Sequence, residues 1–190
     1  MPRALRLQVP GAAYHVMSRG VRRQALFRDD EDRTTFLMIL AEVIRGREWA
    51  CLAFCLLTTH YHLLVRTPAG DLAVGMQRLN SHFAQAFNRR HGERGHVFER
   101  RYRSVLVDRD PHLLELYRYF ALNPVRAGLA AKPENWEWGS YAMIVGDAPR
   151  LSFVNRGWIL PFFGREPRRA RERLRAFVED GASSHFRDGV

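Results

Sequence analysis

The order of hydrophobic patterns along the chain is the feature that most constrains its fold. Apolar runs and alternations typical of strands occur at residues 12–18, 50–56, 60–66 and 97–107. Two segments with apolar residues at helical spacing, 30–45 and 71–90, separate the first strand from the second and the third from the fourth. This β-α-β-β-α-β order predicts an α+β, ferredoxin-like antiparallel sheet with helices on one face.

The segment after the fourth strand predicts a further helix. Asp110 followed by Pro111 combines an N-cap residue with the residue type favoured at the first helical position. The helix is expected to run from Pro111 to about Leu122. We expect a main domain at residues 1–148, followed at 149–190 by an extension with aromatic residues and an Arg-rich helix candidate.

The chain carries no sign of a membrane or secreted protein. No apolar run approaches the roughly 18 residues that span a bilayer, and the N-terminus lacks the apolar stretch of a secretory signal. A cytoplasmic protein with no membrane partner is therefore expected.

The net charge of +10 indicates a polyanionic partner, because clustered cations release counterions from phosphates. Only Lys132 is a lysine, and the planar arginine fork suits phosphates. Genome composition bias is an alternative source of the arginine preference, but it explains the excess charge less well.

Many of the arginines between residues 89 and 103 alternate with aromatic or histidine side chains, a pattern typical of a nucleic-acid surface. A solvated charged rim is the plainer alternative. The residues that we expect to contact DNA are Arg19, Arg22, Arg89, Arg90, Arg94, Arg100, Arg101, Arg103 and Arg126.

His60 and His62 are the candidate metal ligands. They lie two residues apart in a predicted strand, so both imidazoles point to one face and can converge on one ion. A chain with 8 histidines in 190 residues contains such a pair by chance often enough that the spacing alone proves little. The alternative is two half-exposed histidines that bond to neighbours on the sheet.

The helix after Asp110 separates two tyrosines. On a helical wheel Tyr117 falls within the apolar stripe and predicts packing, whereas Tyr119 and Asn123 lie one turn apart on its flank and can share a site. The alternative for Tyr119 is an exposed or rim tyrosine. The alternative for Asn123 is an N-cap, because Pro124 suits the first position of a following helix.

Three segments resemble a known family. They are 59–65 (Thr-His-Tyr-His-Leu-Leu-Val), 94–102 (Arg-Gly-His-Val-Phe-Glu-Arg-Arg-Tyr) and 116–129, which begins Leu-Tyr-Arg-Tyr. Together they resemble the REP-associated tyrosine transposases, a bacterial branch of the IS200-like HUH single-tyrosine transposases. In these enzymes two histidines flanking a bulky residue hold a metal, and a tyrosine on a separate helix is the nucleophile. One departure is Thr59, where many members have Asn.

The resemblance implies a site and a reaction. Tyr119 would be the nucleophile, and His60, His62 and Asn123 would hold Mg²⁺ or Mn²⁺ as the cofactor. The protein would be a monomer or homodimer that cuts and rejoins single-stranded or hairpin DNA through a 5′-phosphotyrosine intermediate. Residues 1–148 would be the nuclease domain, and the extension could contact a hairpin stem.

Two other functions stay open from the sequence. A hydrolase would use His60 and His62 to hold Zn²⁺ and an attacking water. A regulator would bind DNA hairpins with weak or no cleavage. Formation of a covalent protein–DNA adduct distinguishes both from the transposase.

Overall fold

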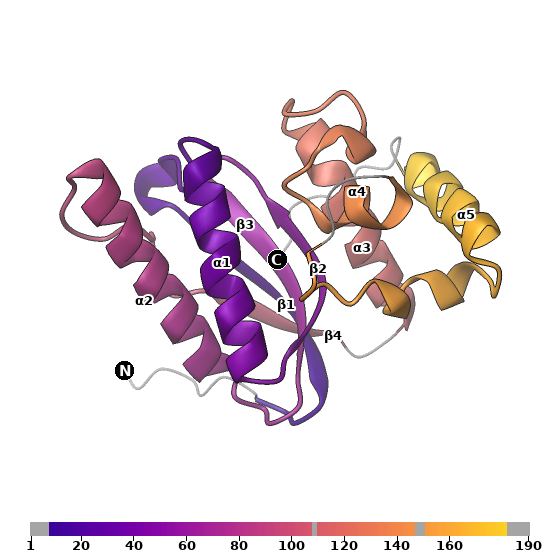
Figure 1. Ribbon diagram of the computed structural model, residues 1–190, viewed down its shortest axis with the longest axis horizontal. Helices are drawn as coiled ribbons and strands as arrows, with labels where there is room; N and C mark the ends of the chain where they lie inside the picture. The colour runs from indigo at the N-terminus through magenta and orange to yellow at the C-terminus, as the bar shows by residue number, and fades with distance from the viewer. Residues whose placement is uncertain (1–7, 108–109, 147–150, 182–190) are drawn as a thin grey trace.

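A four-stranded antiparallel sheet with strand order β2-β3-β1-β4 forms the centre of the protein (Figure 1). The computed structural model describes residues 8–107, 110–146 and 151–181. The strands are β1 (Ala12–Arg19), β2 (Ala50–Leu56), β3 (His60–Thr67) and β4 (Arg103–Val107). This is the strand order of the ferredoxin-like fold, so the predicted fold class is confirmed.

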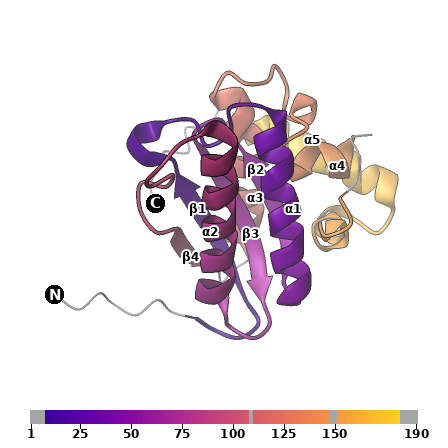
Figure 2. The same ribbon diagram turned by 60° about the vertical axis from the view of Figure 1, so that its left-hand side comes forward.

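Helices α1 (Asp30–Gly46) and α2 (Leu72–His91) cover one face of this sheet side by side (Figure 2). The α1 helix begins where the sequence predicts, because the Asp29 carboxylate accepts hydrogen bonds from the backbone N–H groups of Glu31 and Asp32. Asp71 precedes α2, but its carboxylate binds the side chains of Arg47 and Trp49 rather than the helix end.

The opposite face carries α3 (Asp110–Arg126), followed by α4 (Ser140–Val145) and α5 (Pro167–Asp180). Short 3-10 helices complete the chain, namely η1 (Val21–Arg23), η2 (Pro133–Asn135), η3 (Arg156–Trp158) and η4 (Leu160–Phe163). Alternate residues of β3 divide the core between the two faces. Leu63 and Val65 pack with α1 and α2, whereas Leu64 packs with α3.

The fourth strand is shorter than predicted. It begins at Arg103 rather than at residue 97, and the preceding residues form a loop. The loop still contacts the sheet end, because Phe98 forms a single bridge with Gly20 and the Val21 N–H donates to the Val97 carbonyl. The apolar residues of the segment therefore pack into the core without joining the ladder.

The α3 helix is longer than predicted and continues through Asn123 and Pro124 to Arg126. Pro124 removes one backbone donor, yet the Ala127 N–H still bonds the Asn123 carbonyl. The expectation that Asn123 could cap a following helix is therefore wrong, because it lies inside α3.

The C-terminal extension packs on α3 instead of standing apart from the main domain. Leu174 and Val178 of α5 are fully buried in the cluster that contains the α3 core residues. The Arg118 guanidinium of α3 lies 3.7 Å from the ring centroid of Phe177, and the Trp158 indole N–H donates to the Leu52 carbonyl. No helix among the described residues has the length and apolar character needed to cross a bilayer.

Candidate functional site

The strand alternation predicted for His60 and His62 is present in β3, and both side chains face α3. On the neighbouring strand Arg19 lies opposite His60, and Met17 lies opposite His62. His15, two residues before Met17, shares this face. The sheet thus brings three histidines from two strands under one helix.

His62 is 1% exposed, so the half-exposed alternative is wrong for this residue. Its Nδ1 lies 2.9 Å from Nε2 of His15, and its Nε2 is buried with no hydrogen-bond partner among the described residues. His60 is half-buried, and its Nδ1 lies 3.0 Å from the Thr59 hydroxyl. The ring centroids of His60 and His62 are 5.1 Å apart.

Tyr119 projects from α3 onto these histidines. Its ring centroid lies 5.3 Å from that of His62 and 6.3 Å from that of His15. The side chain is 8% exposed, so the alternative of an exposed rim tyrosine is wrong.

Tyr117 lies in the core, as the helical wheel predicts. It is 1% exposed, and its ring packs near Tyr141 and Trp158, 6.3 and 5.9 Å away between centroids. Burial raises the pKa of the Tyr117 hydroxyl well above its usual value. The two tyrosines of α3 are therefore separated into a packing residue and a residue beside the histidines.

Asn123 follows Tyr119 by one turn of α3 and is 8% exposed. Its side-chain amide nitrogen is buried and has no hydrogen-bond partner within the part of the chain that the structure describes. A buried amide group without a partner is costly, and it commonly marks a place where a ligand or ion binds.

Burial keeps the two inner histidines neutral. It lowers the pKa of His62 well below its usual value, and the neighbouring His15, His60 and Arg19 act in the same direction. The pKa of His15 falls to about 4, mainly through burial and also through His112 and Arg103. Neutral imidazole is the form that binds metals.

His60 and His62 supply only two metal ligands, so a metal site here needs the side chain of Asn123 as a third. Among the described residues, no three His, Cys, Asp or Glu side chains are grouped closely enough to hold an ion. Two imidazoles and one amide oxygen form a mixed nitrogen and oxygen set, with the buried Nε2 of His62 as the clearest open donor.

Comparison with known proteins identifies the family of the chain. A family model described as "Transposase IS200 like" matches residues 8–121, more than half of the 190 residues. The chain belongs to the IS200-like transposases. The matched range contains His15, His60, His62 and Tyr119, while Asn123 and the extension lie beyond it. A search of curated protein sequences finds no match.

A solved structure supports the fold of this IS200-like transposase. The structure of a REP-associated tyrosine transposase bound to a REP hairpin matches with a TM-score of 0.66 and 17% identity, over 82% of this chain and 98% of that chain. A putative transposase from Deinococcus radiodurans R1 matches with a TM-score of 0.45 and 15% identity, over 62% and 95%, too low a score to carry an argument.

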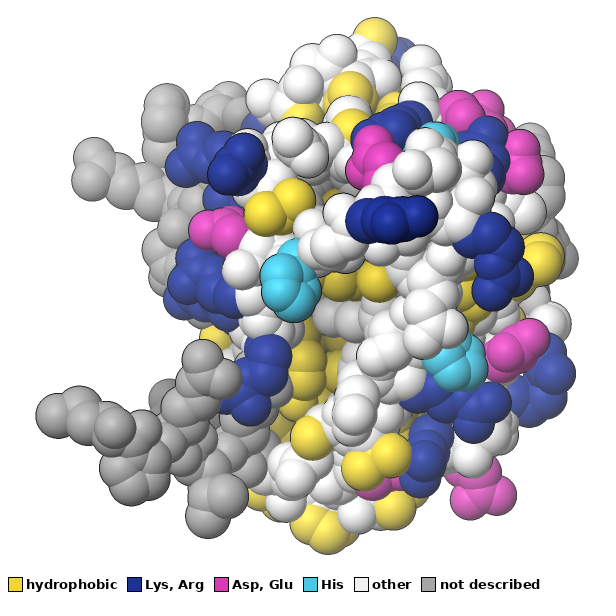
Figure 3. All heavy atoms as spheres, turned by 90° about the vertical axis from the view of Figure 1, so that its left-hand side faces the viewer, with side chains coloured by type: hydrophobic (Ala, Val, Ile, Leu, Met, Phe, Trp, Pro, Cys, Tyr) yellow, Lys and Arg dark blue, Asp and Glu magenta, His cyan; other side chains and the backbone are white. Residues whose placement is uncertain are grey.

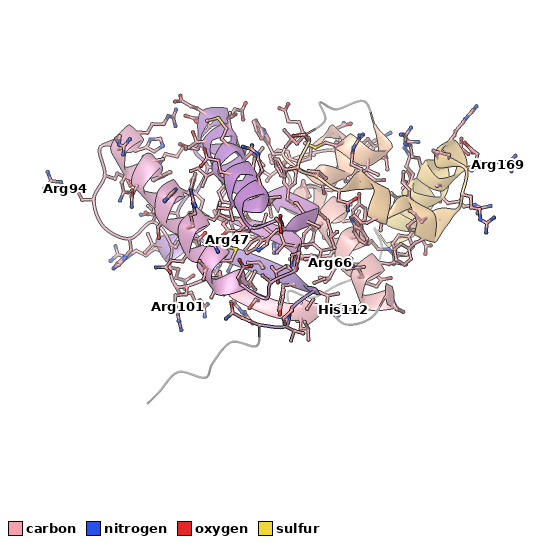
Figure 4. The ribbon with its side chains drawn as sticks, turned by 60° about the horizontal axis from the view of Figure 1, so that its bottom comes forward. Arg47, Arg66, Arg94, Arg101, His112 and Arg169 are labelled. Atoms are coloured by element: carbon pink, nitrogen blue, oxygen red, sulfur yellow. The ribbon has the colours of Figure 1, made fainter. Side chains whose placement is uncertain are left out.

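The arginines expected to contact DNA are mostly exposed, but they do not form one group. Figure 4 shows two of them, Arg94 and Arg101, at one end of the molecule, whereas Arg126 lies at the end of α3 beside Gly181 of the extension. Figure 3 shows arginine side chains spread over one face, with acidic groups among them. Exposed residues of the expected set are Arg22, Arg89, Arg90, Arg94, Arg100, Arg101, Arg103 and Arg126.

Three members of that set have protein partners among the described residues, and the weakest contact is the 3.9 Å ion pair of exposed Arg100 with Glu99. Arg90 forms ion pairs with Asp29, Glu31 and the buried Asp32, so its charge is already balanced within the protein. Arg126 donates to the Gly181 carbonyl at the end of α5. Arg19 is half-buried and lies opposite His60, which makes it the expected arginine nearest the histidine pair in the sheet register.

The sequence interpretation missed His15. In the segment Ala12–Arg19 a polar His15 interrupts a run of mostly buried residues. The signal that could have found it is the two-residue period, which puts His15 on the face opposite to that of the core residues Tyr14 and Val16.

Proposed function

We propose that this IS200-like transposase cuts and rejoins single-stranded DNA through a 5′-phosphotyrosine on Tyr119, with a divalent metal held by His60, His62 and Asn123. The observation that carries the proposal is the meeting of α3 and β3, where the rings of Tyr119 and His62 lie 5.3 Å apart. A nucleophile and a pair of candidate ligands from separate elements thus share one buried region.

The residues present fit a metal. Nε2 of His62 is buried, has no hydrogen-bond partner among the described residues and can bind an ion through its lone pair. The Asn123 side chain can present its oxygen at the position of its unpartnered nitrogen, because the two ends of an amide have nearly the same shape and can exchange places. Held by these residues, Mg²⁺ or Mn²⁺ would polarise a phosphate oxygen of the scissile bond.

The reaction needs no external energy source. The Tyr119 hydroxyl gives up its proton and its oxygen forms a bond to phosphorus as the bond from phosphorus to the 3′ oxygen breaks. The departing 3′ oxygen takes up a proton, so no proton is gained or lost overall. The 5′ end remains on the enzyme as a tyrosine ester. Attack by another 3′-hydroxyl on that ester reverses the step and joins the strands.

Hairpin DNA is the proposed substrate, and the chain is proposed to belong to the REP-associated branch. The similar structure is a transposase bound to a REP hairpin, and the resemblance of three sequence segments points to the same branch. The net charge of +10 and the exposed arginines supply the cations that phosphate binding requires. Exposed Arg168 and Arg169 on α5 give the extension a basic surface for a stem.

A comparison of two tyrosine variants tests the proposal. Labelled hairpin oligonucleotide and Mn²⁺ are incubated with wild-type protein, Tyr119→Phe and Tyr117→Phe, and adducts are resolved on denaturing gels. Tyr119→Phe should form no adduct, because phenylalanine has no oxygen to attack phosphorus. Tyr117→Phe should retain the adduct.

The same denaturing gel, together with a native gel-shift assay for binding, separates the alternatives. Cleavage without any adduct in the wild-type protein would indicate a hydrolase, and binding without cleavage would indicate a regulator. An adduct that survives Tyr119→Phe would contradict the assignment of the nucleophile.

A further inference from the structure

We infer that His15 is a positioning residue that holds His62 in the tautomer whose Nε2 is open to the metal. The inference rests on the proposed function, because it assigns a role relative to the metal ligand His62. His15 touches no proposed substrate atom. It acts through the 2.9 Å contact between its Nε2 and the Nδ1 of His62.

The hydrogen-bond chemistry of this contact permits two arrangements. A hydrogen bond between two neutral imidazoles requires one ring to donate and the other to accept. If His62 donates from Nδ1, its Nε2 carries the lone pair that a metal needs. If His15 donates instead, Nε2 of His62 carries a hydrogen and cannot bind a cation.

The surroundings of His62 favour the first arrangement. Its Nε2 is buried and has no partner among the described residues, so it is unsatisfied in either tautomer of the metal-free protein. A bound cation would satisfy the lone pair of the first arrangement, whereas the N–H of the second would remain without an acceptor. The neighbouring His60 repeats the pattern, because its Nδ1 lies 3.0 Å from the Thr59 hydroxyl. In each histidine a side chain outside the proposed ligand set contacts Nδ1, which is how metal-binding histidines are commonly oriented.

Packing holds His15 in this position. It is 7% exposed, and its ring lies 5.3 Å from Phe120 and 6.3 Å from Tyr119 between centroids. In the sheet His15 lies opposite Leu64 and is therefore a diagonal neighbour of His62. Both ends of the contact are thus fixed by strand register and by α3.

The tautomer can be observed directly in the full-length, metal-free protein. Long-range ¹H–¹⁵N spectra at pH 7.5 distinguish a hydrogen on Nδ1 from one on Nε2 of each histidine. We expect His62 to carry its hydrogen on Nδ1 and His15 to accept through Nε2. A hydrogen on Nε2 of His62 would overturn the inference.

Metal affinity gives a second measurement that is independent of cleavage. Binding of Mn²⁺ alone is measured by electron paramagnetic resonance for wild type, His15→Phe, His15→Gln and His62→Ala. His15→Phe keeps an aromatic ring but no acceptor, so its affinity should fall about 10- to 100-fold. His15→Gln offers an amide oxygen to Nδ1 and should recover most of the affinity.

The outcomes separate this inference from the proposed function. If His62→Ala binds Mn²⁺ as tightly as wild type, or wild type binds none, the proposed metal centre is wrong and the inference fails with it. If His62→Ala is impaired but His15→Phe equals wild type, only the inference fails. If His15→Phe does not fold, the tautomer spectra of the wild-type protein still decide the question.

Discussion

The two faces of the sheet are built from alternate residues of the same strands, yet they differ in polar character. On the face covered by α1 and α2, Tyr61, Leu63 and Val65 of β3 join an apolar core. On the face covered by α3, the intervening positions include His60 and His62. Figure 1 shows the sheet between the two groups of helices.

The faces also differ in which buried polar groups they carry. On the α1 and α2 face the Tyr61 hydroxyl donates to the Asn80 amide oxygen, and the Asn80 nitrogen donates to the Ser18 hydroxyl. On the α3 face Nε2 of His62 and the Asn123 nitrogen lack partners among the described residues. Thr67 Oγ1 of β3 and Arg33 Nε of α1 also lack partners among the described residues, so an unpartnered polar atom alone does not distinguish the faces. What distinguishes the α3 face is that its unpartnered groups are an imidazole and an amide on the elements that carry Tyr119 and the histidine pair.

The largest expected effect comes from removing a ligand on the α3 face. His60→Ala should lower DNA cleavage at least about 100-fold, because a metal supplies several kcal/mol of transition-state stabilisation. Folding should change little, since His60 is only half-buried. Initial cleavage rates with Mn²⁺ measure the effect, and His82→Ala on an exposed part of α2 is the control. Equal cleavage rates for His60→Ala and His82→Ala would contradict a role of His60 as a metal ligand on the α3 face.

The next prediction removes a core side chain on the opposite face, where we expect a loss of stability rather than of cleavage. Leu63 is fully buried against α1 and α2, so Leu63→Ala should lower the free energy of unfolding by about 2–5 kcal/mol. Urea denaturation measures this change. Cleavage per folded molecule should stay near wild type. A loss of cleavage comparable to that of His60→Ala, in protein that remains folded, would show that the α1 and α2 face also takes part in cleavage.

A smaller effect is expected from a single arginine beside the histidines. Arg103 is exposed on β4, lies opposite Met17 and faces the His15 side of the sheet. Arg103→Gln should weaken binding of single-stranded DNA and make the salt dependence shallower by about 0.7 per lost phosphate contact. Arg66→Gln, at the other end of β3, is the control. DNA affinities measured from 50 to 300 mM salt provide the test. Equal slopes of affinity against salt for both variants would contradict a DNA contact at Arg103.

The smallest prediction concerns the loop that follows β1. Arg22 and Arg23 have φ angles of 52° and 60°, in the left-handed region that costs a non-glycine residue energy. Arg22→Gly should therefore leave the unfolding free energy unchanged or raise it by up to about 1 kcal/mol. Arg45→Gly, in the last turn of α1, should lower it by a similar amount. In thermal melts Arg45→Gly should unfold at a lower temperature than wild type and Arg22→Gly at the same or a higher temperature. A clear destabilisation by Arg22→Gly would show that the strain is not relieved.

The sequence predicted those parts of the fold that depend on local patterns. Strand alternation located His60 and His62 on one face, and the helical wheel separated Tyr117 from Tyr119. The short β4 escaped prediction because the apolar residues Val97 and Phe98 pack into the core from a loop. Pairing in the sheet, which no local pattern reveals, decides which of these residues form a strand.

Contacts between distant segments account for the features of the site that the sequence did not predict. His15 joins His62 only through the register of β1 against β3, which lies outside any local pattern. Asn123 suggested a helix boundary because proline often begins a helix, but packing of α3 on the sheet and on the extension keeps the chain helical to Arg126. The burial of α5 residues against α3 likewise depends on contacts between distant segments.

The central claim is that Tyr119, on the α3 face, forms the covalent bond to DNA. The most direct test is to trap the wild-type protein on hairpin DNA with Mn²⁺, digest the protein and the DNA, and locate the remaining 5′-phosphonucleotide by mass spectrometry. Fragmentation should place it on Tyr119 within the peptide that spans residues 119–126. Modification of Tyr117, or of any residue on the α1 and α2 face, would contradict the account.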